Sequence, residues 1–303
     1  MNKNPKSTLN LNNTIKQYYD ASEDEVKRIK AILNSKSYRR SDRDYDFIDS
    51  DIARPMRLQL EYLKVQSILE KKNIEKTIVV FGGTRVTQQS RANLRYAAAK
   101  AALATDPTNE DLQYHLKVAQ RVLDKVKYYQ EACDFATMVA KYSKHHSHTP
   151  VHVMTGGGPG IMEAANKGAY DAGEESIGLN IDLPFEQFPN PYITPELCFS
   201  FRYFALRKLH FMHRARALVA FPGGFGTFDE LFEALTVIQT KTIKPIPIVL
   251  VGKEYWQTAV NFDFLAQEGV ISRKDLTLFK IVETASEAWE HILDWYKTRK
   301  LKI

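Results

Sequence analysis

The chain has 303 residues, 44% of them hydrophobic and 26% charged, so it can bury the core of one large domain or of two small ones. This composition excludes collagenous, low-complexity and intrinsically disordered proteins. The formal net charge is +6 at pH 7, but acids are interleaved with the basic residues. That balance suits a pocket for small phosphorylated ligands as well as it suits a nucleic-acid surface.

The cysteines and the apolar runs indicate the compartment. Cys133 and Cys198 are far apart in the sequence and form neither a disulfide framework nor a zinc-ligand cluster. No apolar run reaches the roughly 20 residues that a membrane helix needs, and residues 1–10 lack the apolar centre of a secretory signal. We therefore expect a soluble, cytoplasmic protein with no membrane partner.

Residues 1–75 are polar and contain no glycine, which predicts a helical N-terminal extension. Ser22 precedes three acids and is a plausible N-cap for a helix that starts there. Residues 41–51 are predicted to form a loop. Over residues 55–72 the apolar side chains recur at helical spacing, so one face of a second helix can pack on the domain that follows.

From Thr77 onward, short apolar runs alternate with helix-like stretches. The runs that predict buried strands are residues 77–81, 151–154, 176–181, 217–221 and 246–251. The stretches that predict helices are residues 89–104, 110–142, 161–172, 201–214, 228–240 and 255–267. Alternation of this kind predicts an α/β fold, a Rossmann-like, doubly wound parallel sheet with helices on both faces.

Two glycine-rich loops follow predicted strands, where ligands of such folds bind. The first, TGGGPG, holds Gly156, Gly157 and Gly158 and leads into a helix whose free N–H groups can bind an anion. A tight turn without a ligand would have the same sequence. The second, residues 221–230, reads FPGGFGTFDE, and two such loops on successive crossovers favour one shared phosphate site. Neither is a Walker or a GxGxxG motif, which disfavours those modes of ATP and NAD binding.

Glu230 has two interpretations. Thr227 with Glu230 three residues later is a capping box, in which each side chain accepts a hydrogen bond from the helix start. A carboxylate beside a phosphate loop could instead face another part of the ligand. The residues alone leave both interpretations open.

A basic stripe precedes the second loop. Its members, spaced to share one helix face, are Tyr203, Arg207, His210 and Arg214. A solvated basic face would explain the stripe, but Arg207 could also enter the cleft and pair with phosphate or stabilise developing charge. The histidines at 145, 146 and 148 have no acidic or cysteine partner nearby, which favours a loop over a metal site.

These residues carry a resemblance. The blocks GGGPGIMEAANKGAYDAG, IGLNIDLPFEQFPNPYITPEL and FRYFALRKLHFMHRARALVAFPGGFGTFDELFEALTVIQTK are similar to the LOG family of cytokinin-activating phosphoribohydrolases and bacterial nucleotide 5′-monophosphate nucleosidases. The likeness runs from about residue 77 to about 295, and the RK pair followed by PGGxGTxxE is its specific signature. It implies a catalytic domain at residues 76–303, with a helical insertion at about 86–145 outside the family core.

The resemblance implies hydrolysis of the N-glycosidic bond of a nucleoside 5′-monophosphate, without a cofactor, by a homo-oligomer. The family's catalytic arginine and glutamate fall on Arg207 and Glu230. The substrate-binding residues that we expect are Gly83, Thr84, Gly156, Gly157, Gly158, Met162, Glu163, Glu186, Lys208, Gly223, Gly224, Gly226, Thr227 and Thr236. Glu163 and Asp229 follow the longer bacterial branch, which favours AMP, GMP or a pyrimidine nucleotide over a cytokinin precursor.

Three other functions were weighed. A non-catalytic carrier of a nucleotide or of molybdenum cofactor would keep the glycine loops but would not need Arg207 and Glu230 as a pair. Binding of single-stranded DNA needs basic and aromatic residues interleaved on one face, which only the N-terminal extension could offer, so we expect no nucleic-acid partner. Decarboxylation with pyridoxal phosphate needs a Schiff-base lysine, and no lysine is singled out for that role.

Overall fold

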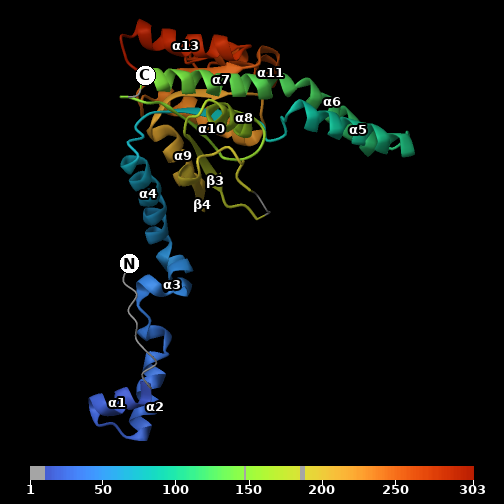
Figure 1. Ribbon diagram of the computed structural model, residues 1–303. Helices are drawn as coiled ribbons and strands as arrows, with labels where there is room; N and C mark the ends of the chain where they lie inside the picture. Colours follow the sequence, from blue (N-terminus) through green and yellow to red (C-terminus); the bar gives the residue numbers. More distant parts are fainter. Residues whose placement is uncertain (1–10, 147, 185–187) are drawn as a thin grey trace. The chain divides into compact units, whose positions relative to one another are not determined.

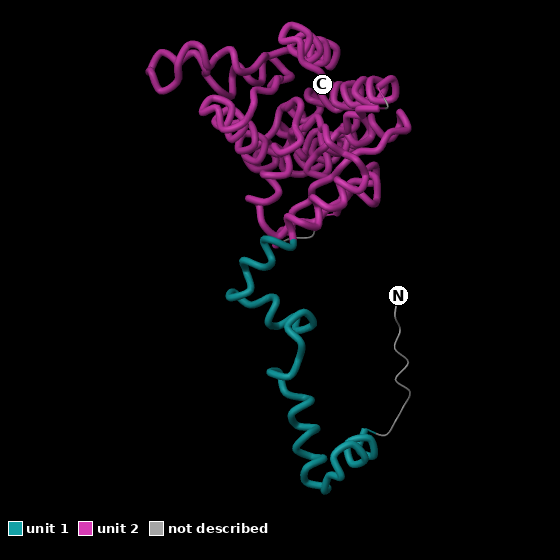
Figure 2. Tube along the Cα trace, turned by 90° about the vertical axis from the view of Figure 1, so that its left-hand side faces the viewer, with its two compact units in different colours: residues 1–60 teal, residues 61–303 magenta. Residues whose placement is uncertain are grey.

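A computed structural model describes residues 11–146, 148–184 and 188–303. The chain divides into two compact units, residues 1–60 and residues 61–303 (Figure 2). The boundary falls within helix α4 (Arg54–Lys71), so the second half of that helix belongs to the larger unit.

The smaller unit is helical. It holds α1 (Leu11–Tyr19), α2 (Glu23–Leu33), α3 (Tyr45–Asp49) and the start of α4. Ser22 caps α2 as predicted, because its backbone N–H donates to the Glu25 carboxylate at 2.8 Å and its side chain accepts from the Glu25 N–H. The loop predicted over residues 41–51 is wrong: two single 3-10 turns flank α3 there, and Asp44 caps α3. A helix of five residues is too short to show an apolar period.

The larger unit is built on one parallel sheet. Its strands are β1 (Thr77–Phe81), β2 (His152–Thr155), β3 (Ser176–Ile181), β4 (Cys198–Phe201), β5 (Ala215–Ala220), β6 (Ile248–Val251) and β7 (Phe279–Val282). Their order is β4-β3-β2-β1-β5-β6-β7, and every pairing is parallel. The predicted Rossmann-like, doubly wound sheet is confirmed. The strand order reverses between β1 and β5, the place where such sheets bind ligands.

Helices cover both faces of the sheet (Figure 1). After α4, the larger unit holds the helices α5 (Gln89–Thr105), α6 (Glu110–Asp124), α7 (Val126–His145), α8 (Ile161–Asp171), α9 (Phe204–His213), α10 (Phe225–Gln239), α11 (Lys253–Ala259), α12 (Phe262–Gln267) and α13 (Ala285–Thr298). The helix predicted over 110–142 breaks at Lys125, and the one over 255–267 breaks where Asn261 caps α12. None of the described helices has the length and apolar composition that crossing a membrane requires.

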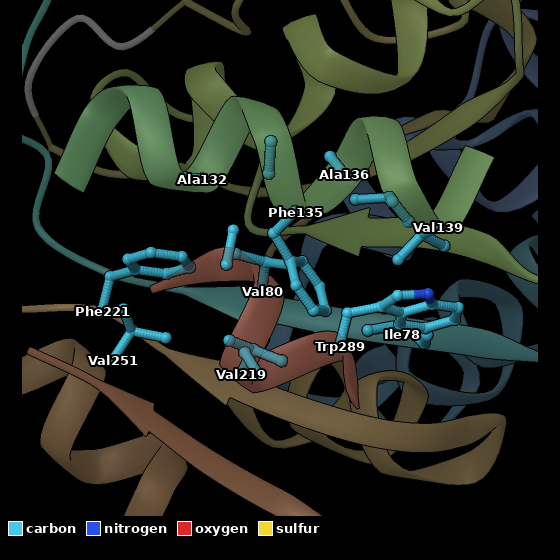
Figure 3. Packing of buried hydrophobic residues seen from close by; sticks show 14 of the residues in the cluster. Ile78, Val80, Ala132, Phe135, Ala136, Val139, Val219, Phe221, Val251 and Trp289 are labelled. Atoms are coloured by element: carbon cyan, nitrogen blue, oxygen red, sulfur yellow. The ribbon is translucent and has the colours of Figure 1, made fainter. Parts of the chain in front are cut away.

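The sheet packs two hydrophobic cores, one on each face. On one face, α7, α8 and α13 cover the strands, and Phe135 meets Trp289 edge to face above Ile78 and Val80 (Figure 3). On the other face, the second half of α4 and helices α9 to α12 cover the strands around Val79. A sheet buried on both sides explains why its central strands are continuously apolar.

Helices α5 and α6 form a hairpin that extends away from the sheet (Figure 1). Ala92 is the one buried residue of α5, and α6 has none. At its base, Arg91 donates to the buried carboxylate of Glu163 in α8 at 3.2 Å. Tyr129 of α7 donates to the same carboxylate at 3.0 Å, so Glu163 ties the hairpin to the core.

We expect Gly168→Ala to destabilise the protein. Helices α7 and α8 pack so closely that a Cβ at Gly168 would clash with the backbone carbonyl of Cys133. Separating two packed helices costs roughly 1–3 kcal/mol, which urea unfolding would detect. Gly226→Ala is the matched control, because a Cβ there meets nothing within 4 Å. Equal unfolding midpoints for the two variants would contradict this account of the contact.

Candidate active site

Three loops meet at the carboxyl edge of the sheet. Gly83, just after β1, donates its N–H to the Pro222 carbonyl after β5 at 2.9 Å. Gly160, just before α8, has a φ of +78°, and a Cβ there would clash with the Gly83 carbonyl and with the Thr84 backbone. Glycine is therefore required at residue 160 both by its backbone conformation and by the close approach of the first loop.

A cavity of about 380 Å³ opens between these loops. Nine of the residues expected at the site line it: Gly83, Thr84, Gly156, Met162, Arg207, Gly224, Gly226, Thr227 and Glu230. Leu183, Phe204, Phe225 and Asp229 line it as well, and the three apolar residues among them belong to no motif that predicts a ligand contact. The fold thus brings both glycine loops, Arg207 and Glu230 to one cavity.

Helix α10 begins at this cavity without a capping side chain. Its N-cap is Gly224, and Phe225 is its first residue. A capping box would need the helix to begin after Thr227, so that interpretation of Glu230 is wrong. Thr227 instead turns its hydroxyl toward Gly223, where a Cβ would clash with it. The Thr227 N–H donates to the Gly224 carbonyl at 2.9 Å, so the N–H groups of Phe225 and Gly226 are the ones left for an anion.

Glu230 lies one turn further along α10. The residue is 8% exposed. Burial raises the pKa of its carboxyl from 4.5 to about 7, although the positive charges of Lys208 and Arg207 oppose the shift. A carboxyl with a pKa near neutrality is suited to a catalytic role, since both of its forms are accessible at physiological pH.

Arg207 reaches the cavity from α9. Its Nε donates to the Leu179 carbonyl of β3 at 2.7 Å, and its guanidinium lies against Gly156, where a Cβ would clash with it. The guanidinium carbon is 5.2 Å from the ring centre of Phe211. Burial lowers the pKa of Arg207, and the nearby charge of Glu230 opposes that shift. The remaining guanidinium N–H groups are free to bind an anionic ligand.

The other members of the basic stripe are structural. His210 is fully buried and stacks on Tyr62 with ring centres 5.2 Å apart. Arg214 is buried and donates to the Ile74 carbonyl at 2.9 Å and to Gln66 at 2.9 Å. A solvated basic face is therefore the wrong interpretation of this stripe.

Lys208 does not line the cavity, and its ammonium group contacts two acids of α10. It forms ion pairs with Asp229 at 2.8 Å and with Glu233 at 2.9 Å. Burial lowers the pKa of Lys208, but the hydrogen bonds that it donates to these carboxylates and their negative charge outweigh burial, so the pKa lies above its ordinary value. Lys208 therefore fixes α9 against α10, the helices that carry Arg207 and Glu230.

The remaining residues that were expected to bind substrate lie elsewhere. Gly223 lines a neighbouring cavity, and Thr236 is exposed two turns beyond Thr227, donating to the Phe232 carbonyl at 2.7 Å. Gly157, Gly158 and Glu163 do not line the cavity, and Glu163 faces α5 and α7. Glu186 lies outside the described residues.

A buried polar network shapes the first glycine loop, and no sequence motif predicted it. Asn190 donates to the carbonyls of Gly157 and Gly158 at 3.2 and 3.1 Å, and to Asn166 of α8 at 2.9 Å. Asn166 also accepts from the Thr155 hydroxyl at 2.7 Å. With its carbonyls held on this side, the loop presents its other surface to the cavity.

Metal binding has no support in the residues that the structure describes. Within them, no three His, Cys, Asp or Glu side chains gather as a metal ion would require. His145 ends α7, and both His145 and His146 bond to carbonyls four residues earlier.

Comparisons with known proteins show what this chain is similar to. A family model described as "Possible lysine decarboxylase" matches residues 162–292. The probable cytokinin riboside 5′-monophosphate phosphoribohydrolase LOGL3 of Oryza sativa subsp. japonica is 27% identical over 152 residues, 47% of this chain and 68% of the relative. The solved X-ray structure of TM1055, a structural genomics target, has a TM-score of 0.44 and 18% identity, covering 72% of this chain and 99% of that one.

Cytokinin riboside 5′-monophosphate phosphoribohydrolase LOG1 of Arabidopsis thaliana is 30% identical over 158 residues. That match covers 50% of this chain and 70% of the relative, whereas the match to LOG4 of the same plant covers 63% of the relative. The residues that the family model matches include the second glycine loop, Arg207 and Glu230, and they begin just after the first loop, residues 155–160. The chain belongs to the LOG family.

Proposed function

We propose that this protein hydrolyses the N-glycosidic bond of a nucleoside 5′-monophosphate and releases the free base and ribose 5-phosphate. The observation that carries the proposal is the position of Glu230, a buried carboxyl with a raised pKa, one helical turn from a glycine loop whose N–H groups are uncapped. The named activity of the LOG relatives supports the same reaction.

The loop at residues 223–227 would hold the 5′-phosphate. Its N–H groups point along α10, whose dipole favours a negative charge at this end. Anchoring the phosphate there places the ribose deeper in the cavity, toward Glu230 and Arg207. Fixing the reacting sugar against a catalytic group supplies a large part of the rate enhancement in reactions of this kind.

The chemistry requires stabilisation of a positive charge on the sugar. The C1′–N bond breaks, a water oxygen bonds to C1′, and a water proton passes to the departing base. The transition state resembles an oxocarbenium ion, which the ionised carboxylate of Glu230 would stabilise while it orients the water or the ribose hydroxyls. Arg207 would offset the negative charge that phosphate and carboxylate bring together.

The base would contact the apolar rim of the cavity. Phe204 is 50% exposed and Phe225 is 96% exposed, although both line the cavity. Exposed phenyl rings at a site of this class can stack on a base without selecting among purines and pyrimidines. A cytokinin riboside monophosphate and AMP therefore both remain substrates to be tested.

The test is to incubate purified protein with AMP, GMP, pyrimidine monophosphates, a cytokinin riboside monophosphate and the matching nucleosides, and to quantify free base by chromatography. Release from monophosphates and none from nucleosides supports the proposal. If folded protein releases no base from any of them, the function is instead binding of a nucleotide.

We expect kcat/KM to rise with pH through a midpoint near 7. Glu230 has its pKa at about 7 and must be ionised to stabilise the positive transition state, so activity is lost as the pH falls below that value. The substrate's phosphate ionises near pH 6 and gives a separate, lower inflection. A pH–rate profile measures both, and a fall in activity above pH 7 would instead make Glu230 a general acid.

A further inference from the structure

A second and larger cavity adjoins the candidate active site. It has a volume of about 600 Å³ and lies between α6 and the loops after β1 and β5. The two cavities share Gly83, Thr84 and Gly224. A Cβ at Gly224 would meet nothing within 4 Å, so no side chain closes the space above the phosphate loop. A ligand whose phosphate occupies that loop can continue into the second cavity.

The second cavity is strongly basic. Four cationic side chains line it: Arg85, Lys117, Arg121 and Lys125. No carboxylate is among the lining residues, and within the described residues none of the four cations forms an ion pair. Asp124 and Glu254 line an adjoining hollow, which Arg121 and Lys125 line as well. Positive charge left unpaired in a cavity indicates an anionic ligand.

The walls of this cavity strengthen that attraction. Val86, Val118 and Val122 line it beside the cations, together with the rings of Tyr114 and Tyr255. Apolar walls lower the local dielectric constant, which increases the attraction between the cations and a phosphate. Lys117 and Arg121 lie four residues apart on α6, so they share one side of the helix, and Lys125 is the C-cap residue that follows it. The projecting hairpin thereby brings cations to the phosphate end of the candidate site.

We propose that this basic cavity binds a second phosphate, so that nucleoside 5′-diphosphates bind more tightly than monophosphates. The inference rests on the proposed function, because it takes the loop at residues 223–227 to hold the first phosphate. The further phosphate lies beyond the loop, away from the bond that breaks.

Calorimetric titration with AMP and ADP tests the binding, using Glu230→Gln protein so that neither nucleotide is consumed. We expect ADP to bind about tenfold or more tightly than AMP, as charge-assisted hydrogen bonds to one more phosphate predict. A Lys117→Gln, Arg121→Gln double variant in the same background should reduce the ADP-to-AMP affinity ratio about tenfold. The matched control is Arg95→Gln with Lys100→Gln, which removes two exposed cations from α5, outside the cavity.

Equal affinities for AMP and ADP, or equal weakening of both by the double variant, would overturn the inference. Base release from AMP by the wild-type protein separates this result from the fate of the proposed function. Hydrolysis of AMP without tighter binding of ADP retains the function and rejects the second-phosphate site. Tighter binding of ADP without release of base retains the second-phosphate site and rejects the proposed function.

Discussion

Glu230→Gln should reduce the release of base from a nucleoside monophosphate by roughly a thousandfold, while leaving the fold intact. The amide has nearly the shape of the carboxyl but cannot take the negative charge that stabilises an oxocarbenium ion. Affinity for the substrate should change far less than kcat, because the phosphate loop supplies the binding. Steady-state kinetics and titration with AMP measure the two effects separately.

The stability of the same variant distinguishes a catalytic loss from misfolding. Folded protein holds the Glu230 proton more tightly than unfolded chain, since its pKa is about 7 in the fold against an ordinary 4.5. Wild-type stability therefore falls as the pH rises from about 4.5 to 7, and the glutamine variant escapes that loss. At pH 8 the variant should be more stable, by up to about 3 kcal/mol, and at pH 4 the two should match. A less stable variant at pH 8 would contradict the assigned burial.

Arg207→Met should lower kcat/KM by roughly a hundredfold and shift the pH profile upward. The positive charge of Arg207 favours the ionised form of Glu230, so its removal raises the pKa of that carboxyl. The midpoint of activity then moves to more alkaline pH. Kinetics at a series of pH values measure the rate loss and the shift together.

Arg207→Lys is the matched control. It retains the charge and loses the planar donor group, so the pH midpoint should stay near that of the wild type although the rate still falls. If the methionine variant lost activity with an unmoved midpoint, Arg207 would act on the substrate alone and not on Glu230.

The central strands were predictable because burial on both faces leaves a continuous apolar run, as in β1 and β6. The edge strands were not. In β4, Ser200 is exposed, and in β7, Lys280 is exposed, so neither forms such a run. The last helix, α13, was likewise not predicted. An edge strand forms because it pairs with one adjacent strand, and the residues of the edge strand alone do not predict that pairing.

The candidate site also has some features that the sequence predicts and others that it does not. Its glycine loops and the positions of Arg207 and Glu230 could be predicted, because they belong to motifs of residues that are close together in the sequence. The role of Glu230 was ambiguous because Thr-x-x-Glu has the spacing of a capping box, and only the start of α10 at Phe225 decides against it. The role of Asn190 could not be predicted from the sequence, because its hydrogen-bond partners lie 24 to 33 residues away and it belongs to an irregular segment.

Because α10 has no side-chain cap, binding of a ligand at the candidate site affects the stability of the hydrophobic core. The helix carries Leu231, Ala234 and Ile238 into one hydrophobic cluster, yet its first turn has no side chain to hold it. A bound phosphate would accept hydrogen bonds from that turn, so the ligand would take the place of an N-cap side chain. Heat resistance should then track ligand concentration by mass action. We expect the protein to be most stable when substrate is abundant, and to unfold first at the N-terminal turn of α10 when substrate is scarce.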